Sequence, residues 1–460
     1  MEINFADRRT SIRQHPLLRD FDPEEAERHL SSMPLQCFAS YVYERPRKMP
    51  LIQPRGGFAL WQKQRDLSLD LRDAGADFIP LTIDSHTRQG DFQRASALLQ
   101  ESERENANLL NGYPLLAHGA ELSRSLFEGI FKPISLRHGT PDARILVEAA
   151  LDSGITEIEG GGLSYCLPYS RNYPVDRALF NWQYIDRLCG HLSKPSRAIH
   201  RESFGPLTAT MVPPVIVAVV EIIELMLAIE QGVLSFSVSF SQTGSLTQDL
   251  ALACALRELI ADNFFELQAC KVSLVFHQWM GAFPLDRAKA DGLITQGAMI
   301  AALCGADKVV VKTRKEAHGI PTNKDNADAV ALTRQAMMNV SPIDALHLPS
   351  VSEEKDMIKD MTKSIVSQIL DLPGVALWEQ VYTAVMQGLI DIPFSPHKDN
   401  RGKIWTARDA SGAIRINDPG LVPISKKFMQ REKHYLAAKA LDKSLDSVLH
   451  DVLWMTTERS

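Results

Sequence analysis

The chain has 460 residues, with 50 lysines and arginines against 56 aspartates and glutamates, so its formal net charge is −6. Hydrophobic residues make up 45% and charged residues 23%, which is typical of folded globular proteins and excludes a largely disordered chain, a collagen-like repeat and a long coiled coil. The acidic balance argues against a nucleic-acid partner held by bulk charge. The length permits two or three average domains, or one α/β barrel with extensions.

The cysteines and the N-terminus predict a cytoplasmic protein. The first residues lack an apolar core, so no signal peptide is expected. The most apolar run, Val215–Ile229, contains Glu221 and Glu224 and follows two prolines, which is typical of a buried helix rather than a bilayer span, so no membrane contact is expected. Scattered cysteines without a CxxC pair favour reduced thiols over a disulfide framework; they are Cys37, Cys166, Cys189, Cys254, Cys270 and Cys304.

Taken in chain order, short apolar runs rich in β-forming residues alternate with helical patterns, the rhythm of a βα fold. Thr140-Pro141, for example, predicts the start of a helix over Asp142–Leu151, and further helices are predicted over Asp249–Asn263 and Thr295–Leu303. A closed (β/α)8 barrel needs eight strands, so one candidate strand must lie outside it. The nine candidates are Pro50–Gln53, Ala76–Ile83, Leu109–Leu116, Pro133–Leu136, Ile155–Ile158, Arg197–Arg201, Val233–Phe240, Val272–Phe276 and Lys308–Lys312.

The pattern changes towards the C-terminus. Two helices are predicted over Glu353–Leu370 and Val375–Gly388, followed by a hairpin around Asp409-Ala410-Ser411-Gly412 and a polar helix. We therefore predict an α/β protein built on a (β/α)8 TIM-like barrel, with an N-terminal arm and a C-terminal α+β extension. The predicted bounds are 1–45 for the arm, 46–345 for the catalytic barrel and 346–460 for the helical and hairpin extension.

Charged or polar side chains stand where many of the predicted strands end. The carboxyl ends of the strands in a (β/α)8 barrel form one face, which holds the active site, so we expect these side chains to converge. A single such residue is most often an ordinary loop residue, but seven together favour a site. Neighbouring glycines, such as Gly160-Gly161-Gly162, allow a close backbone approach to a ligand, with ordinary turns as the alternative. The seven positions are Arg55, Arg88, Arg137 with His138, Glu159, Glu202, His277 and Lys312.

Three converging arginines, Arg55, Arg88 and Arg137, predict an anionic ligand, because guanidinium groups form paired hydrogen bonds with carboxylate or phosphate. The chain has neither a GxxxxGK[ST] nor a GxGxxG phosphate loop, which favours carboxylate. Glu159 suits a substrate ammonium or a proton transfer, or else is a buried counter-ion for one of the arginines. Together these residues predict an amino acid with two carboxylates, glutamate or aspartate.

Other chemistries find less support. There is no GxSxG elbow, no HExxH and no clustered Cys/His spacing, so neither a hydrolase triad nor a metal site is predicted. Asp84-Ser85-His86 opens an Asp-x-His pattern, but Gly90 comes one residue too late for the Asp-x-His-x-x-Gly signature of base-off cobalamin binders. Lys312, at a strand end, suits a Schiff base as in class I aldolases, so a lyase or aldolase is the main alternative mechanism.

Long motifs make the chain resemble a known family. They include Gln53-Pro54-Arg55, Arg137-His138-Gly139-Thr140-Pro141-Asp142, Glu159-Gly160-Gly161-Gly162, Phe276-His277-Gln278-Trp279-Met280-Gly281 and Val311-Lys312-Thr313 with Glu316. From about Gln53 to Phe394 the chain resembles the large (epsilon) subunit of glutamate mutase, also called methylaspartate mutase. The resemblance implies a (β/α)8 barrel that interconverts L-glutamate and threo-3-methyl-L-aspartate by a radical carbon-skeleton rearrangement.

The resemblance also implies a cofactor and a partner. The cofactor is adenosylcobalamin, whose cobalt is carried mainly by a separate small (sigma, or S) subunit, in a complex of two large and two small subunits. The missing Asp-x-His-x-x-Gly signature fits that division. The implied substrate contacts are Arg55, Arg88, Arg137, Glu159, Tyr165 and Tyr169. The implied cofactor contacts are Asn111, Phe204, Lys312 and Glu316, with His277 lining the pocket. The implied catalytic residues are Glu159, Lys312 and Glu316.

The chain departs from the family pattern at several positions. Relatives usually have Gly-Tyr-Gly-x-Cys-Gly-Asn where this chain reads Ser241-Gln242-Thr243-Gly244-Ser245. Cys166 replaces a common asparagine, Ala209 and Ala282 replace glycines, Arg314-Lys315 replace a Pro-His pair, and His318 replaces an aliphatic residue. These changes bear on cofactor contacts, rate and substrate choice more than on reaction class. A related mutase acting on another amino dicarboxylate therefore stays open as an alternative.

Overall fold

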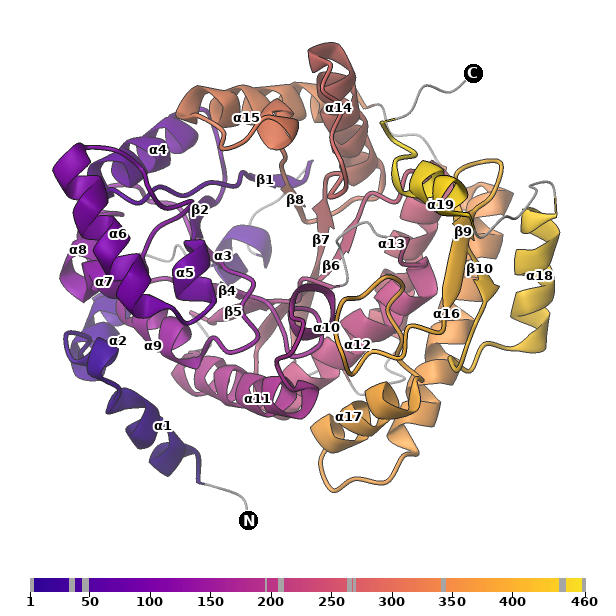
Figure 1. The fold of residues 1–460 in the computed structure, drawn as a ribbon, viewed down its shortest axis with the longest axis horizontal. Coiled ribbons are helices and arrows are strands. Elements are labelled where there is room, and N and C mark those ends of the chain that lie inside the picture. Colours follow the sequence, from indigo (N-terminus) through magenta and orange to yellow (C-terminus); the bar gives the residue numbers. More distant parts are fainter. Residues whose placement is uncertain are drawn as a thin grey trace.

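The computed structural model describes residues 4–32, 38–43, 49–194, 197–205, 211–262, 267, 270–340, 345–437 and 444–456. Its centre is an eight-stranded parallel sheet with the order β1-β8-β7-β6-β5-β4-β3-β2, ringed by helices (Figure 1). The strands are β1 (Leu51–Gln53), β2 (Ile79–Thr82), β3 (Ile134–Arg137), β4 (Glu157–Glu159), β5 (His200–Glu202), β6 (Ser235–Ser241), β7 (Lys271–His277) and β8 (Lys308–Val310).

The sheet is nearly closed into a barrel. The amides of Asp77 and Phe78 donate to the Ile52 carbonyl, and the Thr82 amide donates to the Gly56 carbonyl, so backbone hydrogen bonds join the β1 segment to β2. Strands that follow one another in the chain are neighbours in the sheet, as in a (β/α)8 barrel. The predicted TIM-like fold is confirmed.

The candidate strand Leu109–Leu116 is the one outside the sheet, so that prediction is wrong. Only an isolated bridge between Ile83 and Tyr113 extends the β2 segment, and the chain then enters the short helix α7 (Leu115–His118). Pro114 lacks a backbone N–H. Gly112 crosses the end of β2 so closely that a Cβ there would lie 2.6 Å from the Asp84 nitrogen. The segment is apolar because it packs on the barrel, not because it pairs within it.

Most of the barrel helices surround the sheet, whereas α5 (Ser85–Arg88) and α10 (Cys166–Tyr169) lie inside the ring of helices (Figure 1). The other barrel helices are α4 (Trp61–Asp73), α6 (Phe92–Glu105), α8 (Ala120–Ser125), α9 (Arg144–Asp152), α11 (Val175–Leu192), α12 (Pro214–Glu230), α13 (Leu246–Ala261), α14 (Arg287–Leu303) and α15 (Asn323–Met338), with η3 at Arg314–Ala317. The predicted start at Thr140-Pro141 is wrong, because the Thr140 hydroxyl accepts from the Asp142 amide in a turn and α9 begins only at Arg144. The apolar run Val215–Ile229 is the buried helix α12, as predicted.

The N-terminal arm consists of α1 (Phe5–Arg13), η1 (Pro16–Leu18), α2 (Pro23–Ser32) and α3 (Phe38–Tyr43). Phe38 on α3 is fully buried, and its ring stacks on His200 with 3.4 Å between centroids. The Lys308 ammonium lies 5.1 Å from the same ring. His200 and Lys308 are the first residues of β5 and β8, so α3 closes the amino-terminal end of the barrel.

The C-terminal extension packs against one side of the barrel (Figure 1). It contains η4 (Ala345–His347), α16 (Pro349–Leu370), α17 (Leu377–Gln387), the antiparallel hairpin β9 (Trp405–Arg408) and β10 (Ile414–Asp418), α18 (Lys426–Leu436) and α19 (Leu445–Val452). The predicted pair of helices, the hairpin and the polar helix are all present. Within the described ranges, no helix combines the length and apolarity needed to cross a bilayer.

Candidate active site

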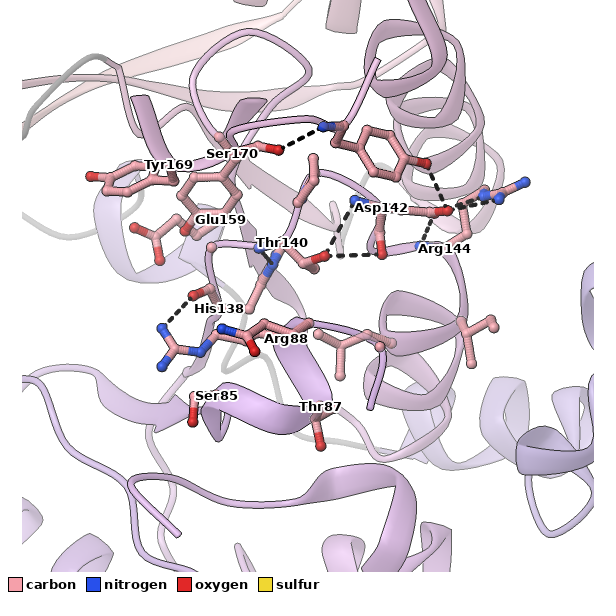
Figure 2. Close-up of a pocket in the computed structure, with 18 of the residues that line it drawn as sticks. Ser85, Thr87, Arg88, His138, Thr140, Asp142, Arg144, Glu159, Tyr169 and Ser170 are labelled. Carbon is pink, nitrogen blue, oxygen red and sulfur yellow. Dashed lines mark hydrogen bonds and ion pairs between the residues drawn. The ribbon is translucent and has the colours of Figure 1, made fainter. Parts of the chain in front are cut away.

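A cavity of about 1060 Å³ opens at the carboxyl end of the barrel strands. Arg137 and Glu159 are the last residues of β3 and β4, and Arg55 and Phe204 follow β1 and β5 closely. Figure 2 shows Arg88, His138, Glu159 and Tyr169 around this cavity. The predicted residues that line it are Arg55, Arg88, Arg137, Glu159, Tyr165, Tyr169 and Phe204. The strand ends thus bring together residues that are far apart in the sequence, as the barrel geometry predicts.

Arg137 is the most firmly held of the three arginines. Its Nε lies 2.8 Å from Glu159 Oε2, and its Nη1 donates to Glu202 Oε1 at 2.8 Å. Burial disfavours the charge of Arg137, but the carboxylates of Glu159 and Glu202 outweigh burial and raise its pKa. This ion pair corresponds to the alternative role that the sequence analysis gives Glu159, a buried counter-ion for one of the arginines.

Arg55 and Arg88 differ from Arg137, because neither has an ion pair within the described part of the chain. The Arg88 Nη1 donates to the His138 carbonyl at 3.3 Å, and its buried Nε has no hydrogen-bond partner there. Burial, with a contribution from Arg55, lowers the pKa of Arg88. The Arg55 Nη1 lies 3.8 Å from the Met280 sulfur. Two guanidinium groups without an ion pair among the described residues, both on one partly buried cavity, favour an anionic ligand.

Aromatic rings form one wall of the cavity. Tyr165 lies 5.9 Å from Tyr169 and 5.4 Å from Phe204, measured between ring centroids. Burial and the nearby Glu159 carboxylate raise the pKa of Tyr165, so its hydroxyl stays protonated and hydrogen-bonds to Glu159. Burial also raises the pKa of Glu159, because its effect is larger than the opposing effect of the Arg137 charge. This wall therefore keeps a protonated hydroxyl and a carboxyl together beside the cavity.

The other predicted residues lie beyond the lining of this cavity. The Lys312 ammonium donates to Glu316 Oε2 at 2.7 Å, and burial together with Arg55 lowers the pKa of Lys312 to about 8. The side-chain oxygen of Asn111 accepts from the Ser85 amide at 2.9 Å. His277 is fully buried, with its Nε2 3.7 Å from Glu202 Oε1. Lys312 and Glu316 form a pair outside the lining of the cavity, and Arg55 lies near enough to affect the pKa of both.

The observed site has two parts that the sequence analysis does not predict. The first is a buried polar layer below the cavity, where Lys308 donates to Gln53 at 2.6 Å and also to Glu157 and Glu202. Its sequence signal is alternation: the strands read Glu157-x-Glu159 and His200-x-Glu202, and alternate residues of a strand share a face. The second is the arm, because Ser11, Ile12, Gln14 and His15 also line the cavity. No sequence pattern signals the second.

Comparisons with known proteins agree with this geometry. The family model described as "Methylaspartate mutase E chain (MutE)" matches residues 36–458. The glutamate mutase epsilon subunit of Desulfitobacterium hafniense is 38% identical over 443 residues, covering 94% of this chain and 92% of the relative. Those of Escherichia coli O157:H7 and Haloarcula marismortui are each 39% identical, covering 85% and 86% of this chain respectively and 81% of either relative.

The family model spans every strand of the barrel and the cavity residues from Arg55 onward, but not the arm residues Ser11, Ile12, Gln14 and His15, and the relatives match most of the chain. The arginines, the carboxylates and the barrel mouth thus belong to a matched region rather than to an isolated motif. The chain belongs to the methylaspartate mutase E chain family, and is therefore a mutase, an enzyme of the isomerase class.

Proposed function

We propose that this chain is the catalytic large subunit of an adenosylcobalamin-dependent mutase that interconverts L-glutamate and threo-3-methyl-L-aspartate. The observation that carries the proposal is the convergence of Arg55, Arg88 and Arg137 with Glu159 on one cavity at the carboxyl end of the barrel. Family membership supports the reaction class, and the charge pattern of the cavity supports a substrate with two carboxylates and one amino group.

Different cavity residues suit different functional groups of the substrate. Arg55 and Arg88, which lack carboxylate partners among the described residues, suit the two substrate carboxylates, and Arg137 is proposed as a further contact to one of them. Glu159 and Tyr165 suit the amino group, because a carboxyl and a phenol can accept from an ammonium. Fixing both ends of a short substrate orients its reacting carbon, an effect worth about 7–11 kcal/mol at best.

Lys312 and Glu316 suit the adenosyl part of the cofactor. Glu316 is only partly buried, its side chain being 29% exposed, and Lys312 holds one of its oxygens. The carboxylate therefore still offers acceptor positions at the rim of the barrel, which is what ribose hydroxyls need. Asn111 and Phe204 are proposed as further contacts. Bound adenosylcobalamin supplies the hydrogen-abstracting radical chemistry that the protein side chains cannot.

A partner completes the proposed enzyme. The curated relatives are named epsilon subunits, and that name implies at least one other subunit. We propose a small cobalamin-binding subunit and a complex of two large and two small chains. A subunit seated over the barrel mouth would exclude water from the reacting groups, which protects reactive intermediates.

The proposal is tested by reconstitution. The chain is mixed with its small subunit, adenosylcobalamin and L-glutamate, and 3-methylaspartate is sought by NMR. Arg88→Met should lower kcat/KM by roughly a hundredfold or more, because it removes a charge-assisted contact to a carboxylate. Arg104→Met is the matched control, since Arg104 is largely exposed on α6, and it should leave kcat/KM unchanged. Absence of product from every four- and five-carbon amino diacid would refute the proposal.

A Lys312 lyase or aldolase is the second candidate, favoured by one observation. A lysine whose pKa is lowered to about 8 is partly neutral, and so nucleophilic, near neutral pH. Against this, Lys312 is paired with Glu316 and does not line the cavity that the arginines share. Borohydride added with a keto acid would trap a covalent adduct on Lys312 in an aldolase, by reducing the imine formed between the lysine amine and the keto carbonyl, and none in a mutase.

A further inference from the structure

Glu202 occupies a junction between the cavity and the interior of the barrel. It is the last residue of β5 and is fully buried. Its Oε1 accepts from Arg137 Nη1 at 2.8 Å, and its Oε2 accepts from the Lys308 ammonium. Burial alone would raise its pKa, but Lys308 and Arg137 hold the pKa of Glu202 well below its usual value. None of the roles assigned above uses this ionised carboxylate.

The contacts to Glu202 and Glu159 determine how Arg137 faces the cavity. Glu159 and Glu202 are opposite each other in the register of β4 and β5, so their carboxylates would repel without a cation between them. Arg137 reaches from β3 and bridges both, using Nε for Glu159 and Nη1 for Glu202. The guanidinium is planar, so two anchored nitrogens fix the direction of the whole group. Neither of these two carboxylates engages Nη2.

We propose that Glu202 is a positioning residue for Arg137: it anchors the guanidinium from below so that Nη2 stays available to a substrate carboxylate. The inference rests on the proposed function, because it takes Arg137 to be a substrate contact. Glu202 does not line the cavity itself and therefore acts only through Arg137. Lys308 contributes by holding the opposite oxygen of Glu202, which prevents the carboxylate from rotating away.

The competing explanation is that Glu202 merely balances buried positive charge. Glu157 provides the means to separate the two explanations. It is also fully buried, lies on the neighbouring strand β4 and accepts a hydrogen bond from the same Lys308 ammonium. It makes no hydrogen bond to Arg137 among the described residues. Glu157→Gln and Glu202→Gln thus make the same side-chain change in the same layer, each removing one carboxyl partner of Lys308, and only the second removes a carboxylate partner of Arg137.

The experiment uses the complex with the small subunit and adenosylcobalamin. Glu202→Gln should raise KM for L-glutamate roughly tenfold or more relative to Glu157→Gln, as expected for loss of one charge-assisted hydrogen bond. The value of kcat should change much less, because Arg137 would bind the carboxylate equally in the ground and transition states. Thermal unfolding of both variants measures whether they fold: each retains one carboxylate partner for Lys308, and Glu202→Gln, which also loses its contact to Arg137, should be the less stable of the two.

A second variant covers the possibility that Glu202→Gln does not fold. Glu202→Asp keeps the charge near the flexible Lys308 side chain but shortens the reach to Arg137, whose Nε stays tied to Glu159. It should raise KM in the same direction. Crystal structures of the variants give a readout independent of turnover: the Arg137 guanidinium should turn in Glu202→Gln and Glu202→Asp and keep its place in Glu157→Gln.

The outcomes are distinguishable. A KM for Glu202→Gln within about threefold of that for Glu157→Gln, with Arg137 in place, would overturn the positioning role and leave Glu202 a counter-ion. A wild-type complex that converts no amino diacid would refute the proposed function instead. In that case the position of the Arg137 side chain in the variant structures alone decides whether Glu202 holds it.

Discussion

The glycines after β4 have a role in packing, in addition to any role in binding a ligand. Gly160 has φ +117°, a backbone conformation that L side chains rarely adopt. A Cβ on Gly161 would lie 2.3 Å from Glu224 Oε1, the oxygen that accepts from the amides of Leu163 and Ser164 at 2.8 and 2.9 Å. The sequence leaves both a close ligand approach and an ordinary turn open at these glycines. The structure shows that Gly161 makes room for a buried carboxylate that holds the loop.

Gly161→Ala should therefore destabilise the protein by about 1–3 kcal/mol, because a methyl group would displace Glu224 from the amides that it caps. Gly292→Ala is the matched control: Gly292 lies in the exposed face of α14, and a methyl group added there would have no neighbouring atom within 4 Å. The control should be neutral or stabilising by about 0.5–1 kcal/mol. Urea unfolding of both variants measures the difference, and equal stabilities would contradict the packing role.

At the scale of single elements, burial follows from what surrounds each helix. α12 is apolar almost all round because the sheet covers one side, while α11, α13, α16 and α17 contact the others. α3 is a short helix that gains its stability from the barrel. Its Phe38 fills the space between His200, Phe78 and Lys308 at the starts of the strands. Both helices are therefore fixed by tertiary contacts rather than by their own propensities.

Phe38→Ala should lower the free energy of unfolding by about 3–5 kcal/mol, because it leaves a cavity under the buried polar layer of the barrel. Phe131→Ala removes the same atoms from a side chain that is 65% exposed, and its effect should stay within about 0.5 kcal/mol. Thermal unfolding of the two variants in parallel tests the comparison. If Phe38→Ala were as stable as Phe131→Ala, the packing of α3 against the amino-terminal end of the barrel would not stabilise the protein.

For the whole molecule, the C-terminal extension acts as part of the barrel's outer layer. α16 contacts α12 and α13 and buries Val351, Ile358, Met361, Ile365, Val366 and Ile369. The side chain of Gln248 on α13 hydrogen-bonds both the amide and the carbonyl of Ile414 on β10. Arg415 on the same strand contacts Glu354 at 2.8 Å, Asp409 at 2.9 Å and Glu432 at 3.4 Å. The Gln248 hydrogen bonds connect the extension to the barrel, and the Arg415 ion pairs connect α16, the hairpin and α18 within the extension.

A chain ending at residue 345 should not yield a soluble monomeric barrel. Removal of α16 would uncover the apolar faces of α12 and α13, and a large exposed apolar patch promotes aggregation. Soluble yield and size-exclusion chromatography, with the full chain alongside, measure this directly. The predicted boundary between 345 and 346 would stand as a folding boundary only if the shortened chain stayed soluble, monomeric and cooperative in thermal unfolding.

Much of the fold and part of the site follow from local pattern. Eight of nine candidate strands, the apolar helix α12 and the C-terminal hairpin are signalled by apolar periodicity and turn residues, which depend only on neighbours in the chain. Arg55, Arg88, Arg137 and Glu159 are placed together because the carboxyl ends of parallel strands meet at one face. For these residues a position along a strand is enough to predict a position in space.

The sequence alone therefore determined the barrel, the strand ends and the kind of charge at its mouth. Tertiary structure decided the rest: that Leu109–Leu116 packs on the sheet instead of joining it, that Arg137 has ion pairs while Arg88 has none among the described residues, and that the arm lines the cavity. The physical reason is the separation along the sequence between the residues that interact. Periodicity records which face of an element is buried, whereas ion pairs and cavity walls depend on which remote side chain arrives opposite, and one sequence does not encode that locally.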